Sequence, residues 1–193
     1  MNNPEEHVDF RCDVSVKAYL DNDVVSGFRK RDLKLEDLAA MTRLKGLADE
    51  GRISLVVSAI HDHEAAPLRE QYRKVQQEIL AIFARVEFAD DHRFYGMNLI
   101  DLGTRGFIAN PLVEDDPIAQ RLRKIGLERR DAHHVMLAVR RECDWFVTCD
   151  VRTILKYRLT VEAAFPIRLR RPSELLSDLW SRPEDTQPPR ERP

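Results

Sequence analysis

The sequence predicts an α/β fold, a three-layer α/β/α sandwich with a central parallel sheet, on three observations. Short apolar runs at 14–20, 53–57 and 145–149 contain many β-branched and aromatic residues, as strands do. Between these runs, apolar residues recur at the spacing of amphipathic helices. Acidic residues follow two of the runs directly, as Asp21 and Asp150. Strands that alternate with helices form a parallel sheet with helices on both faces.

The chain of 193 residues is long enough for one domain with a full core. We expect that domain to span 14–180. The acidic and polar start at 1–13 is expected to be flexible, and the tail at 181–193 is expected to be disordered by composition. Residues 85–117, where short apolar pieces are separated by Asp, Gly and Pro, are expected to form an irregular insertion.

The first strand, at 14–20, is followed by a mixed connection at 22–33 that contains Gly27, and then by an amphipathic helix from 35 to 48. The later elements are expected in this order: a strand at 53–57, a helix from 65 to 83 with a bend at Pro67, a helix from 117 to 125 between Asp116 and Gly126, a helix that starts at Asp131, a strand at 145–149, a short helix at 151–157, a strand at 167–169 and a helix at 172–180.

The composition excludes several classes of protein. A hydrophobic fraction of 43% and a charged fraction of 33% are typical of a soluble globular chain. No apolar run approaches membrane-spanning length, and the polar start is unlike a signal peptide. The cysteines, Cys12, Cys143 and Cys149, are odd in number and form no CxxC pair. A disulfide framework is therefore not expected, and we expect a cytoplasmic location.

The net charge of −2 gives no general case for nucleic-acid binding, but the charge is unevenly distributed. Residues 118–158 contain ten Lys and Arg against five Asp and Glu, a local excess of +5. The candidate contacts to RNA phosphates in this segment are Arg129, Arg130, Arg152 and Lys156. A solvated helical face explains such a run equally well.

Four acidic residues from four segments are predicted to meet at one edge of the sheet: Asp21, Glu64, Asp131 and Asp150. We expect the strands at 14–20, 53–57 and 145–149 to be parallel neighbours, and active sites of open α/β sheets lie at the carboxyl ends of their strands. Taken singly, each acid has an ordinary explanation, as a helix cap or a turn residue. Convergence of all four would instead produce repulsion and raised pKa values.

The order of these segments resembles the PIN domain family of metal-dependent nucleases. The matching segments are LDND at 20–23, SAIHDHE at 58–64, DAHHVMLA at 131–138 and FVTCD at 146–150. The stretch IRLRRPSELL at 167–176 looks like the last strand and helix of that family. The resemblance spans 14–176 and is poor across 85–117.

This resemblance implies hydrolysis of RNA with Mg²⁺ or Mn²⁺, with Asp21, Glu64, Asp131 and Asp150 as the acidic quartet. Hard divalent ions prefer oxygen ligands, and a bound ion acidifies water and offsets phosphate charge. Asp21 and Asp150 are the first choice as metal ligands. Glu64 and Asp131 would hold a second ion or orient the attacking water.

Three further residues are candidate accessory groups. Asp23 lies two positions after Asp21 and can join the acids, Ser58 is a helix cap or a water-positioning hydroxyl, and Thr148 precedes Asp150. The family often has Thr or Ser after the first Asp and Asn two positions after it, whereas this chain has Asn22 and Asp23.

Four histidines suggest a zinc or manganese hydrolase as a rival interpretation: His61, His63, His133 and His134. On a helix, residues two apart point roughly 200° apart and adjacent residues diverge by about 100°, so neither pair would chelate one ion. Packing or solvent-exposed roles are favoured.

Two classes of function follow. The first is a metal-dependent endoribonuclease, similar to a stand-alone PIN protein or to the toxin of a bacterial toxin–antitoxin pair, with RNA as substrate. An antitoxin protein and a second copy of the chain in a homodimer are candidate partners. The second is a catalytically inactive PIN-fold module that binds RNA or acts as an adaptor, in which the acids serve as caps and ion-pair partners.

Overall fold

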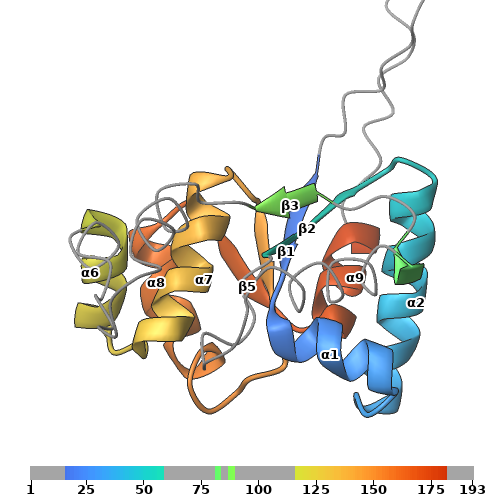
Figure 1. Cartoon of the computed structure of the whole chain (residues 1–193), viewed down its shortest axis with the longest axis horizontal. Helices are drawn as coiled ribbons and strands as arrows, with labels where there is room; N and C mark the ends of the chain where they lie inside the picture. Colours follow the sequence, from blue (N-terminus) through green and yellow to red (C-terminus); the bar gives the residue numbers. More distant parts are fainter. Residues whose placement is uncertain (1–15, 59–80, 84–86, 90–115, 182–193) are drawn as a thin grey trace, which may run out of the picture.

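The computed structural model describes residues 16–58, 81–83, 87–89 and 116–181, which form an α/β fold around one parallel sheet (Figure 1). The strands of the described sheet lie in the spatial order β3-β2-β1-β4-β5. They are β1 (Lys17–Leu20), β2 (Ser54–Ser58), β3 (Glu87–Ala89), β4 (Trp145–Val147) and β5 (Arg168–Arg170). Every neighbouring pair is parallel. The prediction that the strands near 14–20, 53–57 and 145–149 are parallel neighbours is confirmed, with β1 in the middle.

The helices of the described residues are α1 (Asn22–Lys30), α2 (Leu35–Asp49), α6 (Pro117–Ile125), α7 (Arg129–Arg140), the 3₁₀ helix η1 (Leu155–Tyr157), α8 (Arg158–Ala164) and α9 (Pro172–Ser181). The start of α6 follows from its sequence, because the Asp116 carboxylate accepts hydrogen bonds from the amides of Ile118 and Ala119 at 2.8 and 3.3 Å. Gly126 ends that helix at a φ of 119°, where a side chain would be strained.

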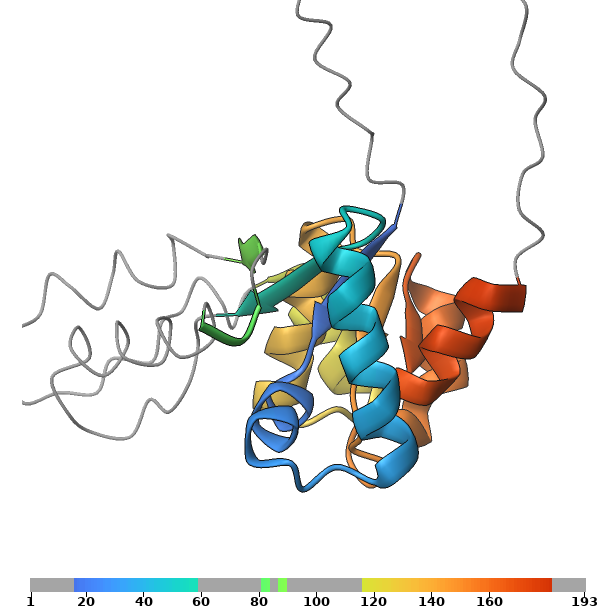
Figure 2. The ribbon, with the colours of Figure 1, turned by 90° about the vertical axis from the view of Figure 1, so that its right-hand side faces the viewer.

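Helices pack on both faces of the sheet (Figures 1 and 2). On one face, Tyr19 and Phe146 pack against α6, α7 and α8. On the other, Leu20 and Trp145 pack against α1, α2 and α9. Alternate residues of a strand point to opposite faces, so the continuous apolar strands predicted from sequence fill both cores. Full burial of each such aliphatic or aromatic side chain contributes about 1.5–3 kcal/mol.

The mixed connection expected at 22–33 contains a regular helix that was not predicted, because Asn22–Lys30 forms α1. Asp21 caps this helix, and Val24 and Val25 are buried. The glycine that suggested a loop has a packing role. A Cβ on Gly27 would lie 2.5 Å from Cδ2 of Leu33, so a larger residue here would require the Leu33 side chain to move.

Other boundaries also differ from the predictions. The segment 85–117 is not wholly irregular, since Glu87–Ala89 pairs with β2 as β3. The helix predicted to start at Asp131 starts at Arg129, with Glu128 as N-cap. The last strand lies at Arg168–Arg170 rather than 167–169, and α8 was not predicted.

Several predictions fall largely outside the described residues, namely the flexible start at 1–13, the helix at 65–83 and the tail at 181–193. In the described part of the chain, none of the helices has the length and apolar character needed to cross a membrane.

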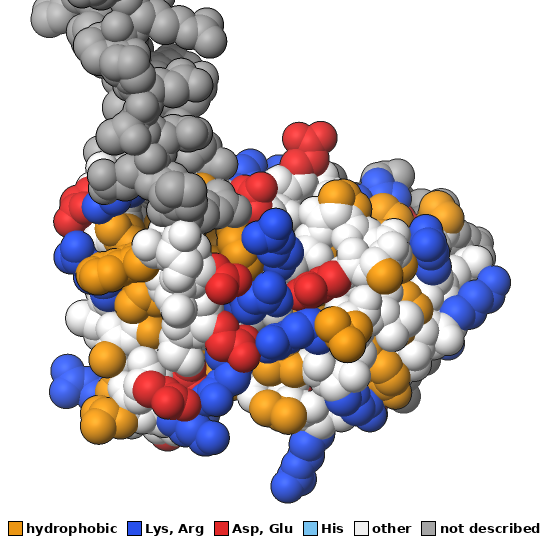
Figure 3. Space-filling model, turned by 180° about the vertical axis from the view of Figure 1, so that it is seen from behind, with side chains coloured by type: hydrophobic (Ala, Val, Ile, Leu, Met, Phe, Trp, Pro, Cys, Tyr) orange, Lys and Arg blue, Asp and Glu red, His pale blue; other side chains and the backbone are white. Residues whose placement is uncertain are grey.

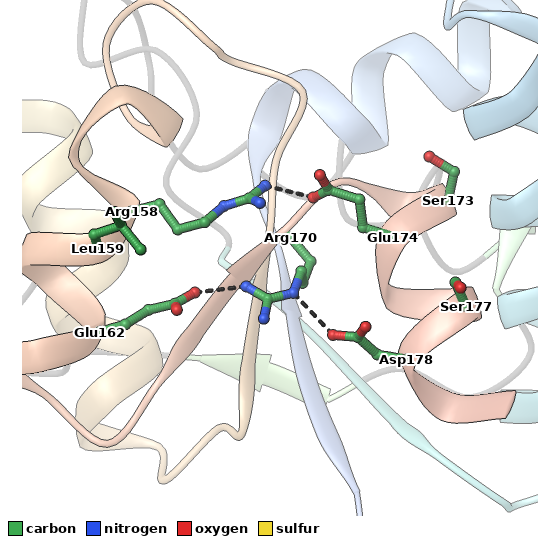
Figure 4. A pocket seen from close by; sticks show the side chains of 8 residues that line it. All are labelled: Arg158, Leu159, Glu162, Arg170, Ser173, Glu174, Ser177 and Asp178. Atoms are coloured by element: carbon green, nitrogen blue, oxygen red, sulfur yellow. Dashed lines mark hydrogen bonds and ion pairs between the residues drawn. The ribbon is translucent and has the colours of Figure 1, made fainter. Parts of the chain in front are cut away.

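Side chains of the same molecule occupy the outer edge of β5. The Glu162 carboxylate accepts from the backbone amide of Leu169 at 2.8 Å, and the Arg170 guanidinium donates to the carbonyl of Leu169 at 2.8 Å. Arg170 also pairs with Glu162 at 2.6 Å and Asp178 at 2.8 Å, which joins α8 to α9 (Figure 4). A hollow of about 570 Å³ lies here, and acidic and basic side chains are intermixed on this face (Figure 3). The outward-facing amide and carbonyl of Leu169 are therefore satisfied by side chains of the same chain.

Candidate functional site

Asp21 lies where β1 ends and α1 begins, at the carboxyl edge of the sheet. Its backbone amide donates to the carbonyl of Val147 at 2.9 Å, which extends the pairing of β1 with β4 by one residue. Its carboxylate Oδ1 accepts from the amide of Asn22 at 2.7 Å, as an N-cap does. Only 6% of Asp21 is exposed. The same residue is thus a helix cap and a buried carboxylate at the predicted site.

Asp23 faces the loop that follows β4. Its Oδ2 accepts a hydrogen bond from the backbone amide of Cys149 at 3.0 Å. Asp23 belongs to the first turn of α1, where a negative charge interacts favourably with the helix dipole. The structure therefore places this predicted accessory residue against the loop at 148–150.

Thr148 connects the two carboxylates. Its hydroxyl donates to Oδ2 of Asp21 at 2.8 Å and lies 3.4 Å from each carboxylate oxygen of Asp23. The hydroxyl oxygen also accepts from the amide of Asp150 at 3.0 Å. Thr148 is fully buried, so these contacts form away from water. The predicted accessory position of Thr148 is a hydrogen-bonded bridge between Asp21 and Asp23.

Burial raises the pKa of both bridged acids from the ordinary value of 3.8. The pKa of Asp21 rises to about 6, mainly through burial, and the negative charge of Asp131 adds to the rise while the bond from Thr148 opposes it. The pKa of Asp23 rises to about 7, again mainly through burial, with the charges of Asp21 and Asp150 adding to it. Of the four predicted acids, Asp21 thus has a raised pKa, but burial rather than the predicted repulsion is its main cause.

Asp131 approaches the pair from α7. Burial raises its pKa, the charges of Asp150 and Glu128 raise it further, and Thr153 and Lys156 oppose the rise. Its Oδ2 is buried and has no hydrogen-bond partner within the described residues. A buried carboxylate oxygen without a donor is costly, and a cation is one means of satisfying it.

Asp150 behaves differently from the other acids. Its Oδ1 accepts from the amides of Arg152 and Thr153 at 2.8 Å each, and its Oδ2 accepts from the Thr153 hydroxyl at 2.7 Å. Burial alone would raise its pKa, but these bonds together lower it below the ordinary value. Asp150 is therefore a charged cap of its own turn, and its charge acts on Asp23 and Asp131 through space.

Part of the predicted constellation lies outside the described residues. This holds for Glu64, His61, His63 and the side chain of Ser58. In the ranges that the structure describes, no three His, Cys, Asp or Glu side chains are grouped closely enough to hold a metal ion.

The two described histidines have structural surroundings. His134 Nδ1 and the Tyr19 hydroxyl are hydrogen-bonded at 2.8 Å, and His133 is buried. The rings of His133 and His134 are 6.5 Å apart and nearly perpendicular. These positions fit the packing role that was favoured from the sequence.

The four candidate phosphate contacts lie on exposed surface. Arg129 and Arg130 belong to the first turn of α7, and Arg152 and Lys156 belong to the segment after β4. Lys156 and Arg152 are close enough to the site to lower the pKa values of Asp131 and Asp150, respectively. A polyanion that crosses this edge of the sheet would therefore meet positive charge beside the carboxylates.

Asp37 is an acid that the sequence gave no reason to place near the site. It is fully buried in the first turn of α2, where the pattern suggested only an acid that complements the helix dipole. It accepts from the Ser173 hydroxyl at 2.7 Å and pairs with the Arg171 guanidinium. The Cys149 thiol lies 3.8 Å from its Oδ2. No local signal in the sequence marks these contacts, because the partners lie more than a hundred positions away.

The donor chemistry of the site fits a hard divalent cation. Asp21, Asp23 and Asp131 offer carboxylate oxygens, which Mg²⁺ and Mn²⁺ prefer, whereas the Cys149 thiol beside Asp23 is a soft ligand. Burial raises the pKa of that thiol to about 12, with Asp23 and Asp37 adding to the rise, so it stays protonated at neutral pH. A thiolate site for zinc is therefore disfavoured.

Comparisons of this chain with protein-family models, curated proteins and solved structures find no match. The carboxylate geometry described above is the basis of the proposal that follows.

Proposed function

We propose that this chain is a Mg²⁺- or Mn²⁺-dependent endoribonuclease with a PIN-like, three-layer α/β/α fold. One observation carries the proposal: the buried carboxylate of Asp21 and the partly buried carboxylate of Asp23 share the Thr148 hydroxyl at the carboxyl edge of a parallel sheet. Two carboxylates with purely structural roles are rarely placed side by side away from water without a cationic partner, because burial and like charge raise their pKa values.

Asp21 and Asp23 are the described residues proposed to hold the ion, with Glu64 as a further ligand and with Asp131 acting through its charge on Asp21. Asp23 replaces Asp150 as the partner of Asp21, since the Asp150 oxygens accept hydrogen bonds from residues 152 and 153. When bound, the ion would supply positive charge to offset clustered carboxylate and phosphate charge, and would acidify water for hydrolysis.

The remaining residues of the site have positioning and electrostatic roles. Thr148 keeps Asp21 and Asp23 together, and Asp150 holds the turn that carries Arg152 and Thr153. Lys156 and Arg152, with Arg129 and Arg130, would bind phosphates of the RNA backbone. RNA would thus lie across the carboxyl edge of the sheet, beside β1 and β4.

Cleavage of a labelled RNA with Mn²⁺ tests this proposal. Asp21→Asn and Asp23→Asn should each abolish cleavage, and EDTA should stop the wild type. Asp144→Asn is the matched control, because Asp144 precedes β4 at the opposite edge of the sheet, where it accepts from the Lys17 amide at 2.8 Å. Cleavage that survives both site variants, in preparations shown free of contaminating nuclease, would refute the assignment.

The alternative is a catalytically inactive PIN-fold module that binds RNA or acts as an adaptor. The hydrogen bonds accepted by both Asp150 oxygens favour it, because they give this acid a structural role as the cap of its turn. The two proposals differ in one respect that is easily measured. The module should bind RNA without Mn²⁺ and should lose nothing when Asp23 is changed to Asn.

Finer assignments rest on the resemblance of the motifs to the PIN family. A role as the toxin of a toxin–antitoxin pair, an antitoxin partner, a homodimer and a cytoplasmic location are all part of the proposal. A small gene immediately upstream that encodes a DNA-binding protein would support the toxin role.

A further inference from the structure

Asp37 is a buried charge that the proposed chemistry does not use. It has no exposed surface, although it lies in the first turn of α2. Burial of an ionised carboxylate costs several kcal/mol unless hydrogen bonds and an opposite charge compensate it. The compensation comes from the start of α9: the Arg171 guanidinium, the Ser173 amide at 3.2 Å and the Ser173 hydroxyl at 2.7 Å.

Cys149 connects this buried charge to the candidate site. Its thiol donates towards Oδ2 of Asp37 at 3.8 Å, and its backbone amide donates to Oδ2 of Asp23 at 3.0 Å. One residue therefore contacts the structural acid with its side chain and the site acid with its main chain. The sulfur contact is weak by itself, but it lies in a partly buried network where each group restricts its neighbours.

The loop at 148–150 is held from two further directions. The amide of Thr148 donates to the carbonyl of Arg170 at 3.0 Å, which extends the pairing of β4 with β5 by one residue. Arg171, the next residue, forms the ion pair with Asp37. The ion pair thus fixes the end of β5 against α2. The loop at 148–150 contacts both, and it brings the Thr148 hydroxyl to Asp21 and the Cys149 amide to Asp23.

We propose that Asp37 is a positioning residue of the carboxylate site: through Cys149 and Arg171 it sets where the loop at 148–150 presents its donors to Asp23. This inference rests on the proposed function, because its expected consequence is a change in affinity for a divalent ion. Residues that orient metal ligands commonly change affinity by about 10- to 100-fold when replaced. If Asp37 only joined α2 to α9, its replacement would lower stability and leave the loop at 148–150 and the ion affinity unchanged.

The experiment compares two ways of breaking the connection with a matched control. Asp37→Asn removes the buried charge. Cys149→Ala keeps the Asp37–Arg171 pair and removes only the thiol, so it isolates the link even if the first variant folds poorly. The control is Asp116→Asn, another buried aspartate, 7% exposed, that caps a helix and pairs with an arginine, Arg140, but does not contact the loop.

Two readouts are taken on each full-length variant. The first is hydrogen exchange of the Cys149 amide in EDTA, corrected for the intrinsic rate of the residue present. The second is the Mn²⁺ dissociation constant by calorimetry. Asp37→Asn and Cys149→Ala should speed exchange and weaken Mn²⁺ binding by about 10-fold. Cys149→Ser, which restores a donor, should recover most of the slow exchange and most of the Mn²⁺ affinity. Asp116→Asn should lose stability but keep wild-type exchange and wild-type Mn²⁺ affinity.

The outcomes separate this inference from the proposed function. If the wild type binds no Mn²⁺, the metal-dependent function fails, and the exchange readout alone decides whether Asp37 positions the loop. If the wild type binds Mn²⁺ but Asp37→Asn and Cys149→Ala keep wild-type exchange and affinity, Asp37 is only a structural ion pair and the inference is overturned. If Asp116→Asn lost as much protection of the Cys149 amide and as much Mn²⁺ affinity as the other two variants, the inference would be overturned as well, because the effect would then follow from general destabilisation.

Discussion

The Thr148 hydroxyl donates to Oδ2 of Asp21 at 2.8 Å, across 127 positions of sequence. Its oxygen also lies 3.4 Å from both carboxylate oxygens of Asp23. A threonine hydroxyl carries one proton, so it cannot donate fully to both acids at once. Because one proton is shared between two neighbouring carboxylates, the pair favours uptake of a further proton or binding of a cation.

Replacement of Thr148 tests this relationship directly. Thr148→Val keeps the shape and removes the hydroxyl, so Asp21 loses a donor in a buried environment. We expect a loss of about 1–3 kcal/mol in the free energy of unfolding. Thr148→Ser, which keeps the hydroxyl, should lose clearly less. The measurement is urea unfolding at neutral pH, and equal losses in the two variants would assign the effect to packing instead.

The raised pKa values of Asp21 and Asp23 predict how stability depends on pH. Between pH 4 and 7, folded chains retain protons that unfolded chains have released, because the folded pKa values of about 6 and 7 exceed 3.8. The contribution of these groups is thus fully present below pH 3.8 and is lost as pH rises through 6 to 7.

Asp23→Asn isolates that contribution. In EDTA the variant should gain stability relative to wild type as pH rises, on the order of 1 kcal/mol near neutral pH after allowance for solvent screening. Urea unfolding of both proteins at acidic and neutral pH gives the difference. A difference that does not change with pH would show that Asp23 has an ordinary pKa in the folded state.

Loss of the charge of Asp131 and loss of the charge of Asp150 should change the stability of the metal-free protein in opposite directions. Asp131→Asn should stabilise the metal-free protein by about 0.5–2 kcal/mol, because it removes a charge that burial disfavours. Asp150→Ala should destabilise it by about 1 kcal/mol, because the turn loses its capping carboxylate. Thermal melts in EDTA at neutral pH test both. Destabilisation by Asp131→Asn would identify Asp131 as a structural residue of the first turn of α7.

The occupied edge of β5 predicts an effect on association. A Glu162→Ala, Arg170→Ala double variant frees the amide and carbonyl of Leu169, which are then available to an added strand. We expect concentration-dependent self-association in sedimentation velocity. Glu36→Ala is the control, because Glu36 is exposed and its 3.2 Å pair with Arg171 does not involve Leu169. Association no stronger than in the control would mean that other features protect this edge.

The parts of the fold that were predictable are those in which local pattern and global packing agree. The runs that contain Leu20, Val57 and Phe146 are apolar because both faces of the sheet are covered, so composition alone identifies them as strands. The helix α1 was missed for the converse reason. Its stability comes from the burial of Val24 and from the cap by Asp21, whereas Gly27 taken alone suggests a loop.

The site was only partly predictable. Strand ends located Asp21 and Asp150, since parallel strands deliver their carboxyl ends to one edge. The sequence could not show that Asp150 turns its oxygens towards residues 152 and 153 and leaves Asp23 to face Asp21. It also could not show that Asp37 is buried against Arg171. Each of these facts depends on side-chain direction or on long-range contacts, which residue spacing does not encode.

Calorimetric titration with Mn²⁺ at neutral pH tests the central claim most directly, because it needs neither the RNA target nor a partner. We predict saturable binding to the wild type, loss of at least about 10-fold in affinity in Asp21→Asn and in Asp23→Asn, and wild-type affinity in Asp144→Asn at the opposite edge of the sheet. No binding to the wild type, or equal binding to wild type and both site variants, would contradict the claim that these carboxylates form a metal site.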